Sequence, residues 1–140
     1  MAHDFQLTVD SAQPHDQADW WAETLGWQVE PSDKAFIQRM VDEGQASPED
    51  TTRHRGVLVW AAGAALRHPD NGRRILFQQV PEGKTVKNRL HLDIEVGAEQ
   101  VESVAAELTR RGATFLHNGR QGPFSWITMA DPEGNEFCIC

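Results

Sequence analysis

Two stretches of the chain show the same succession of hydrophobic and polar positions. Residues 5–10 alternate as in a half-buried strand, and residues 16–25 place apolar side chains at helical spacing. Gly26 follows, and a glycine is typical of the position just after a helix. Residues 90–111 repeat this order of a strand and an amphipathic helix, and Gly112 ends the second helix.

The spacing of the two stretches indicates an internal duplication. Gln6 precedes Gly26 by 20 positions, and His91 precedes Gly112 by 21. Self-similarity of this kind is the sequence signature of a structure built from repeated units. We therefore expect Gln6 and His91 to occupy equivalent positions in the two halves.

Three further strands are predicted in each half. In each half the last two strands are separated by a turn that contains Pro and Gly, as turn geometry favours. The predicted strands are residues 27–30, 57–61 and 75–80 in the first half, and 114–117, 125–130 and 136–140 in the second. The pattern predicts an α+β fold of two βαβββ modules that form a pair of half-barrels with a cleft.

The first half is longer because residues 31–55 are inserted in it. Residues 34–43 have a helical pattern, and the polar stretch that follows is expected to be a mobile loop. The insertion could form a lid over a pocket or pack over the edge of a sheet. We expect one domain, 1–140, with the first module at about 3–80, a linker at 81–88 and the second module at about 89–140.

Composition excludes several classes of function. A net charge of −8 argues against binding nucleic acid, which requires a concentrated basic surface. No apolar run is long enough to span a bilayer, and the first residues do not resemble a signal peptide, so we expect a cytoplasmic protein without membrane contact. Cys138 and Cys140 lie two residues apart on one predicted strand, so they share a face and are expected to be free thiols.

The aromatic residues suggest an apolar pocket. The chain has five Trp and six Phe but no Tyr, and large rings without hydroxyl groups suit either a core or a binding surface. Trp60 and Trp126 lie on predicted strands of opposite halves and are candidates for the walls of a cleft. On the first helix, Trp21 is expected in the core and Trp20 partly exposed.

Two segments carry a resemblance to a known family. ILFQQVPEGKTVKNRLHLDIEV and the ending DPEGNEFCIC, in this order of elements, resemble the glyoxalase-like branch of the vicinal oxygen chelate superfamily. This superfamily includes glyoxalase I, bleomycin-resistance proteins and extradiol dioxygenases. The resemblance covers essentially the whole chain and also implies that the segment 119–123 borders a ligand.

The resemblance implies a degenerate metal site. Relatives hold a metal through the first and last strands of each half, which here gives Gln6, Gln78, His91 and Cys138. Gln6 and His91 match the family pattern, whereas Gln78 and Cys138 stand where glutamates are usual. Without those carboxylates we expect no tightly held metal, although zinc could use His91 and Cys138. His91 could instead be a hydrogen-bonded core residue, and Cys138 a small buried hydrophobe.

Two functions remain open at this stage. The first is a protein that binds a small apolar or aromatic molecule in the cleft between the modules, lined by Gln6, Trp60, Gln78, His91, Trp126 and Cys138. The second is a lyase, isomerase or dioxygenase that uses His91 as its catalytic residue, together with Cys138 or a neighbouring carboxylate, and with or without a divalent metal. Asp93 and Glu95 are the carboxylates on the same face. Glyoxalase I activity itself is not expected. Exposed strand edges and the family resemblance also predict a homodimer.

Overall fold

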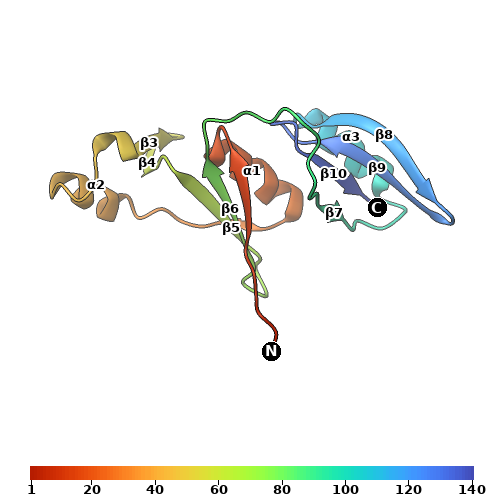
Figure 1. Ribbon diagram of the computed structural model, residues 1–140, viewed down its shortest axis with the longest axis horizontal. Coiled ribbons are helices and arrows are strands. Elements are labelled where there is room, and N and C mark those ends of the chain that lie inside the picture. The colour runs from red at the N-terminus through yellow and green to blue at the C-terminus, as the bar shows by residue number, and fades with distance from the viewer. The chain divides into compact units, whose positions relative to one another are not determined.

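The computed structural model describes all 140 residues, which form two compact units, 1–82 and 83–140 (Figure 1). Each unit contains a four-stranded sheet with one helix packed against it. The first unit comprises β1 (Leu7–Ser11), α1 (Pro14–Leu25), β2 (Gln28–Val29), β5 (Gly63–Arg67) and β6 (Arg74–Gln79), with an insertion between β2 and β5. The second comprises β7 (Asp93–Ile94), α3 (Val101–Arg110), β8 (Thr114–Gln121), β9 (Phe124–Ala130) and β10 (Glu136–Ile139).

The two sheets have the same topology. Their strand orders are β1-β6-β5-β2 and β7-β10-β9-β8, so in each unit the first strand pairs with the last. That pair is parallel in both units, and the other pairs are antiparallel. The prediction of two βαβββ modules in an α+β fold is therefore confirmed.

One face of each sheet is buried against its helix. Along β6, Ile75 and Phe77 are buried, and along β10 Phe137 and Ile139 are buried, while the residues between them lie on the opposite face. We call that opposite face the helix-free face of each sheet. It is the face on which functional side chains are available to a ligand.

The first helix is buried over a wider arc than the sequence suggests. Gly26 ends α1 in the left-handed conformation with a φ of 69°, as expected for a helix terminus. Trp21 is buried, as predicted, but Trp20 is also buried, and the prediction that it is partly exposed is wrong. The two rings contact each other edge to face with centroids 5.0 Å apart, so both contribute to the core.

The insertion is more ordered than predicted and extends further along the chain. It contains α2 (Lys34–Asp42), the short 3-10 helix η1 (Pro48–Asp50), β3 (Thr51–His54) and β4 (Val57–Trp60). The last two strands form a separate two-stranded sheet. The expected loop after the helix is thus partly a strand, and the strand predicted at 57–61 belongs to the insertion.

In the main sheet, β5 occupies the position that was predicted for the strand at 57–61. The sequence of β5, Gly-Ala-Ala-Leu-Arg, has low β-propensity. The hydrophobic run of β4 is the stronger strand signal, so propensity selected the wrong segment.

Three predicted boundaries also change. The strand expected at 90–96 is regular only at Asp93–Ile94. The segment 119–123 is not a separate loop, because β8 continues to Gln121 before it turns into β9. Of the expected linker 81–88, residues from Gly83 onward belong to the second unit. None of the helices combines the length and apolar character that crossing a bilayer would require.

Candidate functional site

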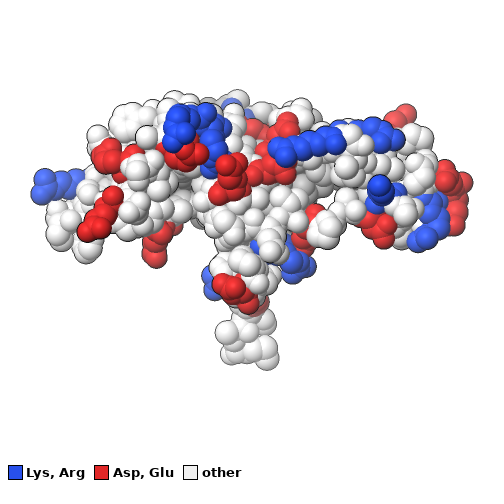
Figure 2. Space-filling view, turned by 180° about the vertical axis from the view of Figure 1, so that it is seen from behind, with Lys and Arg blue, Asp and Glu red and all other residues white.

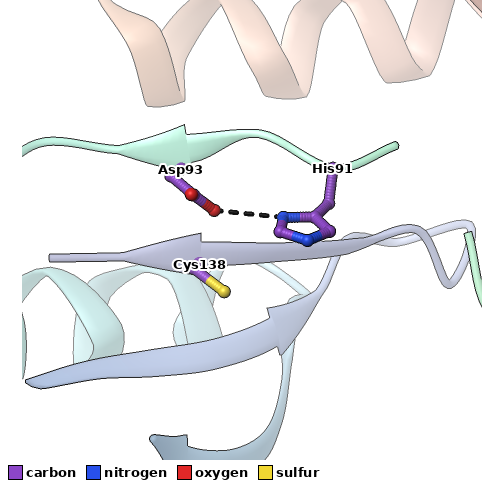
Figure 3. Close-up of side chains that lie close together, drawn as sticks. All are labelled: His91, Asp93 and Cys138. Carbon is purple, nitrogen blue, oxygen red and sulfur yellow. Dashed lines mark hydrogen bonds and ion pairs between the residues drawn. The ribbon is translucent and has the colours of Figure 1, made fainter. Parts of the chain in front are cut away.

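Three side chains that can bind a metal lie together on the helix-free face of the second sheet (Figure 3). They are His91, Asp93 and Cys138, and their potential ligand atoms all lie within 4.8 Å of one another. His91 Nδ1 and Asp93 Oδ1 are 3.1 Å apart and form a hydrogen bond. We call these three residues the His–Asp–Cys cluster.

The register of β7 and β10 brings the cluster together. His91 and Asp93 are two residues apart in extended chain, so their side chains project to the same side, as the sequence predicted. Cys138 is the direct partner of Asp93 in the parallel ladder, and its neighbours Phe137 and Ile139 point into the core. The cluster therefore depends on one long-range pairing.

The exposure of the His91 side chain decides whether it is a core residue or a candidate site residue. The His91 side chain is 40% exposed, so its interpretation as a core histidine is wrong. Cys138 is half-buried and lies 3.4 Å from the Thr128 hydroxyl, so it is neither a buried hydrophobe nor fully accessible. Both groups are available to a small molecule on this face.

The donor set of the cluster fits a metal of intermediate softness. It combines an imidazole nitrogen, a carboxylate oxygen and a sulfur, which are the ligand types that Zn²⁺ accepts, and three protein ligands leave one position open. From the sequence, Asp93 was expected only as an acid–base partner, so no carboxylate was expected to bind a metal. The parallel pairing of Asp93 with Cys138 supplies that carboxylate.

The second thiol is a poorer ligand than Cys138. Both cysteines are free, as predicted. Burial raises the pKa of the Cys140 thiol, and the negative charges of Asp93 and Glu95 raise it further. Its sulfur lies 3.7 Å from the Ile94 carbonyl oxygen. Because metals bind the thiolate, we expect Cys138 to be the sulfur ligand.

A tryptophan lies on the same face of the sheet as the cluster. Thr128 of β9 is the partner of Cys138, and Trp126 lies two residues before Thr128 on β9, roughly 7 Å from it by strand geometry. The Trp126 ring packs directly over Gly119, where an added Cβ would be only 2.1 Å from the indole. The glycine therefore allows the large ring to lie against the sheet. This face therefore presents an aromatic ring over β8 and β9 and a polar centre at β7 and β10.

The predicted ligand positions of the first unit differ from those of the second. The Gln6 side chain accepts a hydrogen bond from Arg74 at 3.0 Å, and Gln78 is exposed. Thr8 lies two residues after Gln6, as Asp93 lies two residues after His91, and the partner of Thr8 on β6 is Leu76. By register, Leu76 rather than Gln78 is therefore the counterpart of Cys138. The convergence of the two units' residues on one cleft stays a prediction.

The chain just before His91 is fastened to β10 by Glu136. The Glu136 carboxylate accepts hydrogen bonds from the Lys84 ammonium and from the Asn88 backbone N–H, both at 3.0 Å. The Asn88 side-chain amide donates to the side-chain Oδ1 of Asn135 at 2.9 Å. We call this set the Glu136 clamp. Burial alone would raise the pKa of Glu136, but these hydrogen bonds and the Lys84 charge lower it to about 2.

Trp60 lies on β4 of the insertion and lines a cavity within the first unit. Other lining residues, His15, Asp19 and His54, were not identified from the sequence. His15 and Asp19 lie on α1, His54 on β3, and their contacts join positions 35 or more residues apart. Local sequence patterns carry no signal for such contacts.

The duplicated βαβββ topology and the helix-free faces are features of the vicinal oxygen chelate superfamily. Within it, the glyoxalase-like domain family matches residues 6–140, and the chain belongs to this family. No curated protein matches the sequence.

Solved structures with the same fold include enzymes and resistance proteins. Fosfomycin resistance protein FosX from Listeria monocytogenes is 10% identical, with a TM-score of 0.65 over 99% of this chain and 90% of that chain. A possible glyoxalase from Bacillus cereus is 13% identical, with a TM-score of 0.61 over 96% and 94%. A glyoxalase/bleomycin resistance protein/dioxygenase family enzyme from Burkholderia phytofirmans is 16% identical, with a TM-score of 0.60 over 96% and 94%. At these identities the likeness establishes the fold.

Proposed function

We propose that the protein binds a small molecule with an apolar or aromatic part on the helix-free face of the second sheet. The observation that carries the proposal is that Trp126 and the His–Asp–Cys cluster lie on the same helix-free face of one sheet. The indole supplies a flat apolar surface, and His91, Asp93 and the Cys138 thiol supply hydrogen-bonding groups. Ligand sites commonly combine a mainly apolar wall with a few polar groups in this way.

The charge distribution of the surface is consistent with recognition by local side chains. Basic and acidic residues are interspersed on the face drawn in Figure 2. Such a surface does not provide a broad field of one sign to attract a highly charged ligand. We therefore expect affinity to depend on contacts within the site.

The proposal is tested by titrating the ¹⁵N-labelled full chain with 2-naphthoate and 2-naphthalenemethanol. We expect at least one of them to shift the Trp126 indole N–H signal and the backbone signals of β9 and β10. Trp126→Ala should weaken this binding about three- to tenfold, as loss of one aromatic contact predicts. Trp27→Phe, a change in the first unit, serves as the control and should leave it unchanged. If both compounds leave the second unit unaffected at millimolar concentration, the proposal is wrong.

A second candidate function is a metal-dependent lyase, isomerase or dioxygenase, which the donor set of the cluster favours. His91, Asp93 and Cys138 would hold the metal, which as a Lewis acid would polarise an oxygen of the substrate. His91 would then act as a ligand. Without a metal, the His91 and Asp93 hydrogen bond orients the imidazole so that it can accept a proton.

Cobalt binding separates these possibilities. If the cluster binds a divalent metal, Co²⁺ should produce the near-ultraviolet absorption of a cobalt–thiolate bond, and Cys138→Ser should abolish it. Asp93→Asn should weaken Co²⁺ binding by about tenfold or more, whereas Cys140→Ser should leave it unchanged. Elemental analysis of protein purified without a metal-affinity tag shows which metal is retained. Protein that contains no stoichiometric metal and gives no such absorption would exclude the metal-dependent candidate.

We also propose that the protein forms a homodimer. In the second unit β8 is an edge strand, and Phe115, Leu116 and Phe124 of the β8–β9 hairpin are exposed apolar residues. Edge strands with exposed apolar side chains are commonly covered by a partner. Light scattering at micromolar concentration should give twice the 15.7 kDa of one chain. A mass that stays at one chain as the concentration rises would exclude the dimer.

A further inference from the structure

The first unit contains a cavity of about 410 Å³, and none of the residues of the His–Asp–Cys cluster lines it. It lies among α1, the inserted strands β3 and β4, and strands of the main sheet. Its volume falls within the range of small-molecule sites, roughly 300–1,000 Å³. The insertion, whose role the sequence left open, therefore forms part of the wall of a cavity.

The cavity wall is apolar over much of its surface. Val57, Val59 and Trp60 of β4 line it together with Leu76 of β6. These side chains favour a ligand with an apolar body, because the ligand then leaves water without losing hydrogen bonds.

The carboxylates that line the cavity are already paired with cations. Glu30 contacts Arg67 at 2.6 Å and accepts two hydrogen bonds from Arg74, at 2.8 and 3.0 Å. The hydrogen bonds from Arg74 lower the pKa of Glu30 despite its burial. Asp19 contacts His54 at 2.6 Å and Arg55 at 3.2 Å. A cationic ligand would therefore have to compete with existing partners.

Two histidines line the same cavity, and each has one ring nitrogen without a hydrogen bond. His15 Nε2 lies 2.8 Å from the Trp60 carbonyl oxygen, so this nitrogen must carry the proton. His54 Nε2 likewise donates to the Asp19 carboxylate. The two rings are stacked with centroids 5.2 Å apart. In the neutral form each ring therefore retains an unprotonated Nδ1, which can accept a hydrogen bond.

The Nδ1 atom of His54 lies near α1. It is 3.7 Å from the Asp16 carboxylate, which is 75% exposed and therefore strongly solvated. At that distance no hydrogen bond forms, so the Nδ1 lone pair stays available. Apolar walls, paired carboxylates and two imidazole acceptors together define the ligand chemistry.

We propose that this cavity is a second ligand site, which binds a neutral apolar molecule through a hydroxyl group that donates to His15 or His54. The neutral charge follows from the ion pairs, because the carboxylates of Asp19 and Glu30 and the guanidinium groups of Arg55 and Arg74 already neutralise one another. The apolar body follows from β4 and Leu76, and the hydroxyl donor from the imidazole nitrogens. The site does not depend on the function proposed for the second unit.

The test compares 4-ethylphenol with its methyl ether on the ¹⁵N-labelled full chain. The two have similar apolar bodies, but only the phenol can donate a hydrogen bond. We expect the phenol to bind about three- to tenfold more tightly, the effect of one hydrogen bond. It should shift the backbone signals of α1, β3 and β4 and the Trp60 indole signal. Equal affinities, or no shifts in these elements, would refute the proposal.

Two variants locate the acceptor. His54→Phe and His15→Phe keep an aromatic ring but remove the nitrogen, and at least one should reduce phenol affinity to that of the ether. His117→Phe, an exposed change on β8, is the matched control and should have no effect. Trp126→Ala should also leave this binding unchanged, which distinguishes it from the site in the second unit. If His54→Phe disturbs the β3–β4 hairpin, the comparison of the phenol with its ether on the native chain still tests whether the site needs a hydroxyl donor.

Discussion

Replacing either of two buried phenylalanines with alanine is expected to lower the free energy of unfolding by about 3–5 kcal/mol. Phe77 of β6 and Phe137 of β10 are each 1% exposed and lie on the helix-covered faces of the two sheets. Truncation removes buried apolar surface and leaves a cavity that close-packed neighbours fill only in part. Each substitution acts on the sheet that carries the functional side chains.

Chemical denaturation followed by tryptophan fluorescence measures this loss of unfolding free energy. The conservative changes Phe77→Leu and Phe137→Leu are the controls and should cost much less, because they keep most of the buried volume. Amide hydrogen exchange shows which strands are destabilised. Phe137→Ala should reduce the protection of backbone amides in β9 and β10, and Phe77→Ala should reduce it in β5 and β6. A loss below about 1 kcal/mol for either alanine variant would mean that the site repacks, and that this residue does not anchor its sheet.

The parts of the fold that the sequence predicted correctly rest on local patterns. Alternation along β10, helical spacing in α1 and the terminating Gly26 are each visible within a short window. The duplication was visible because both halves follow the same order of elements, and the matching sheet orders confirm it. Local β-propensity gave a wrong strand in one place. It favoured β4 over β5, so β5 was missed and β4 was assigned to the main sheet.

In the candidate sites, too, local contacts could be predicted from the sequence and long-range contacts could not. The shared face of His91 and Asp93 follows from strand periodicity and was predicted. That Asp93 also faces Cys138 depends on the parallel register of β7 and β10, across 45 positions. The contact of His54 with Asp19 depends on where the inserted hairpin packs. No local pattern encodes these contacts, because they follow from tertiary pairing.

The strand register of the first sheet differs from the one that the family resemblance implied. The resemblance gave Gln6, Gln78, His91 and Cys138 as the positions of the metal ligands, with Gln78 as the counterpart of Cys138. The β1–β6 ladder instead puts Leu76 opposite Thr8, where β10 has Cys138 opposite Asp93. A shift of two residues keeps the side chain on the same face, so the alternation of apolar and polar residues could not reveal it.

Replacing Glu136 with glutamine is expected to lower the free energy of unfolding by about 3 kcal/mol at pH 7. The side chains of Glu136 and Lys84 are 15% and 18% exposed, so the ammonium would remain largely buried without a counter-ion. Removing one partner of such a pair costs more than the pair itself contributes. The clamp holds the segment that leads to His91, so its loss should also disorder the His–Asp–Cys cluster.

The pH dependence of stability gives an independent measurement of the same group. The pKa of Glu136 is lowered from 4.5 to about 2, so its contribution is complete above pH 4.5 and is lost as the pH falls towards 2. Denaturation of the native chain should show this loss across that window, and Glu136→Gln should lack it. Glu99→Gln, an exposed change, is the control and should behave as the native chain does.

A double substitution separates the charge effect from the loss of packing. Lys84→Met combined with Glu136→Gln removes the unpaired ammonium, so it should recover part of the stability that Glu136→Gln alone loses. The Asn88 N–H can still donate to the glutamine carbonyl oxygen, so the segment before His91 should regain some of its order. Equal stability of native protein and Glu136→Gln, within about 0.5 kcal/mol at pH 7, would show that the clamp does not hold this segment.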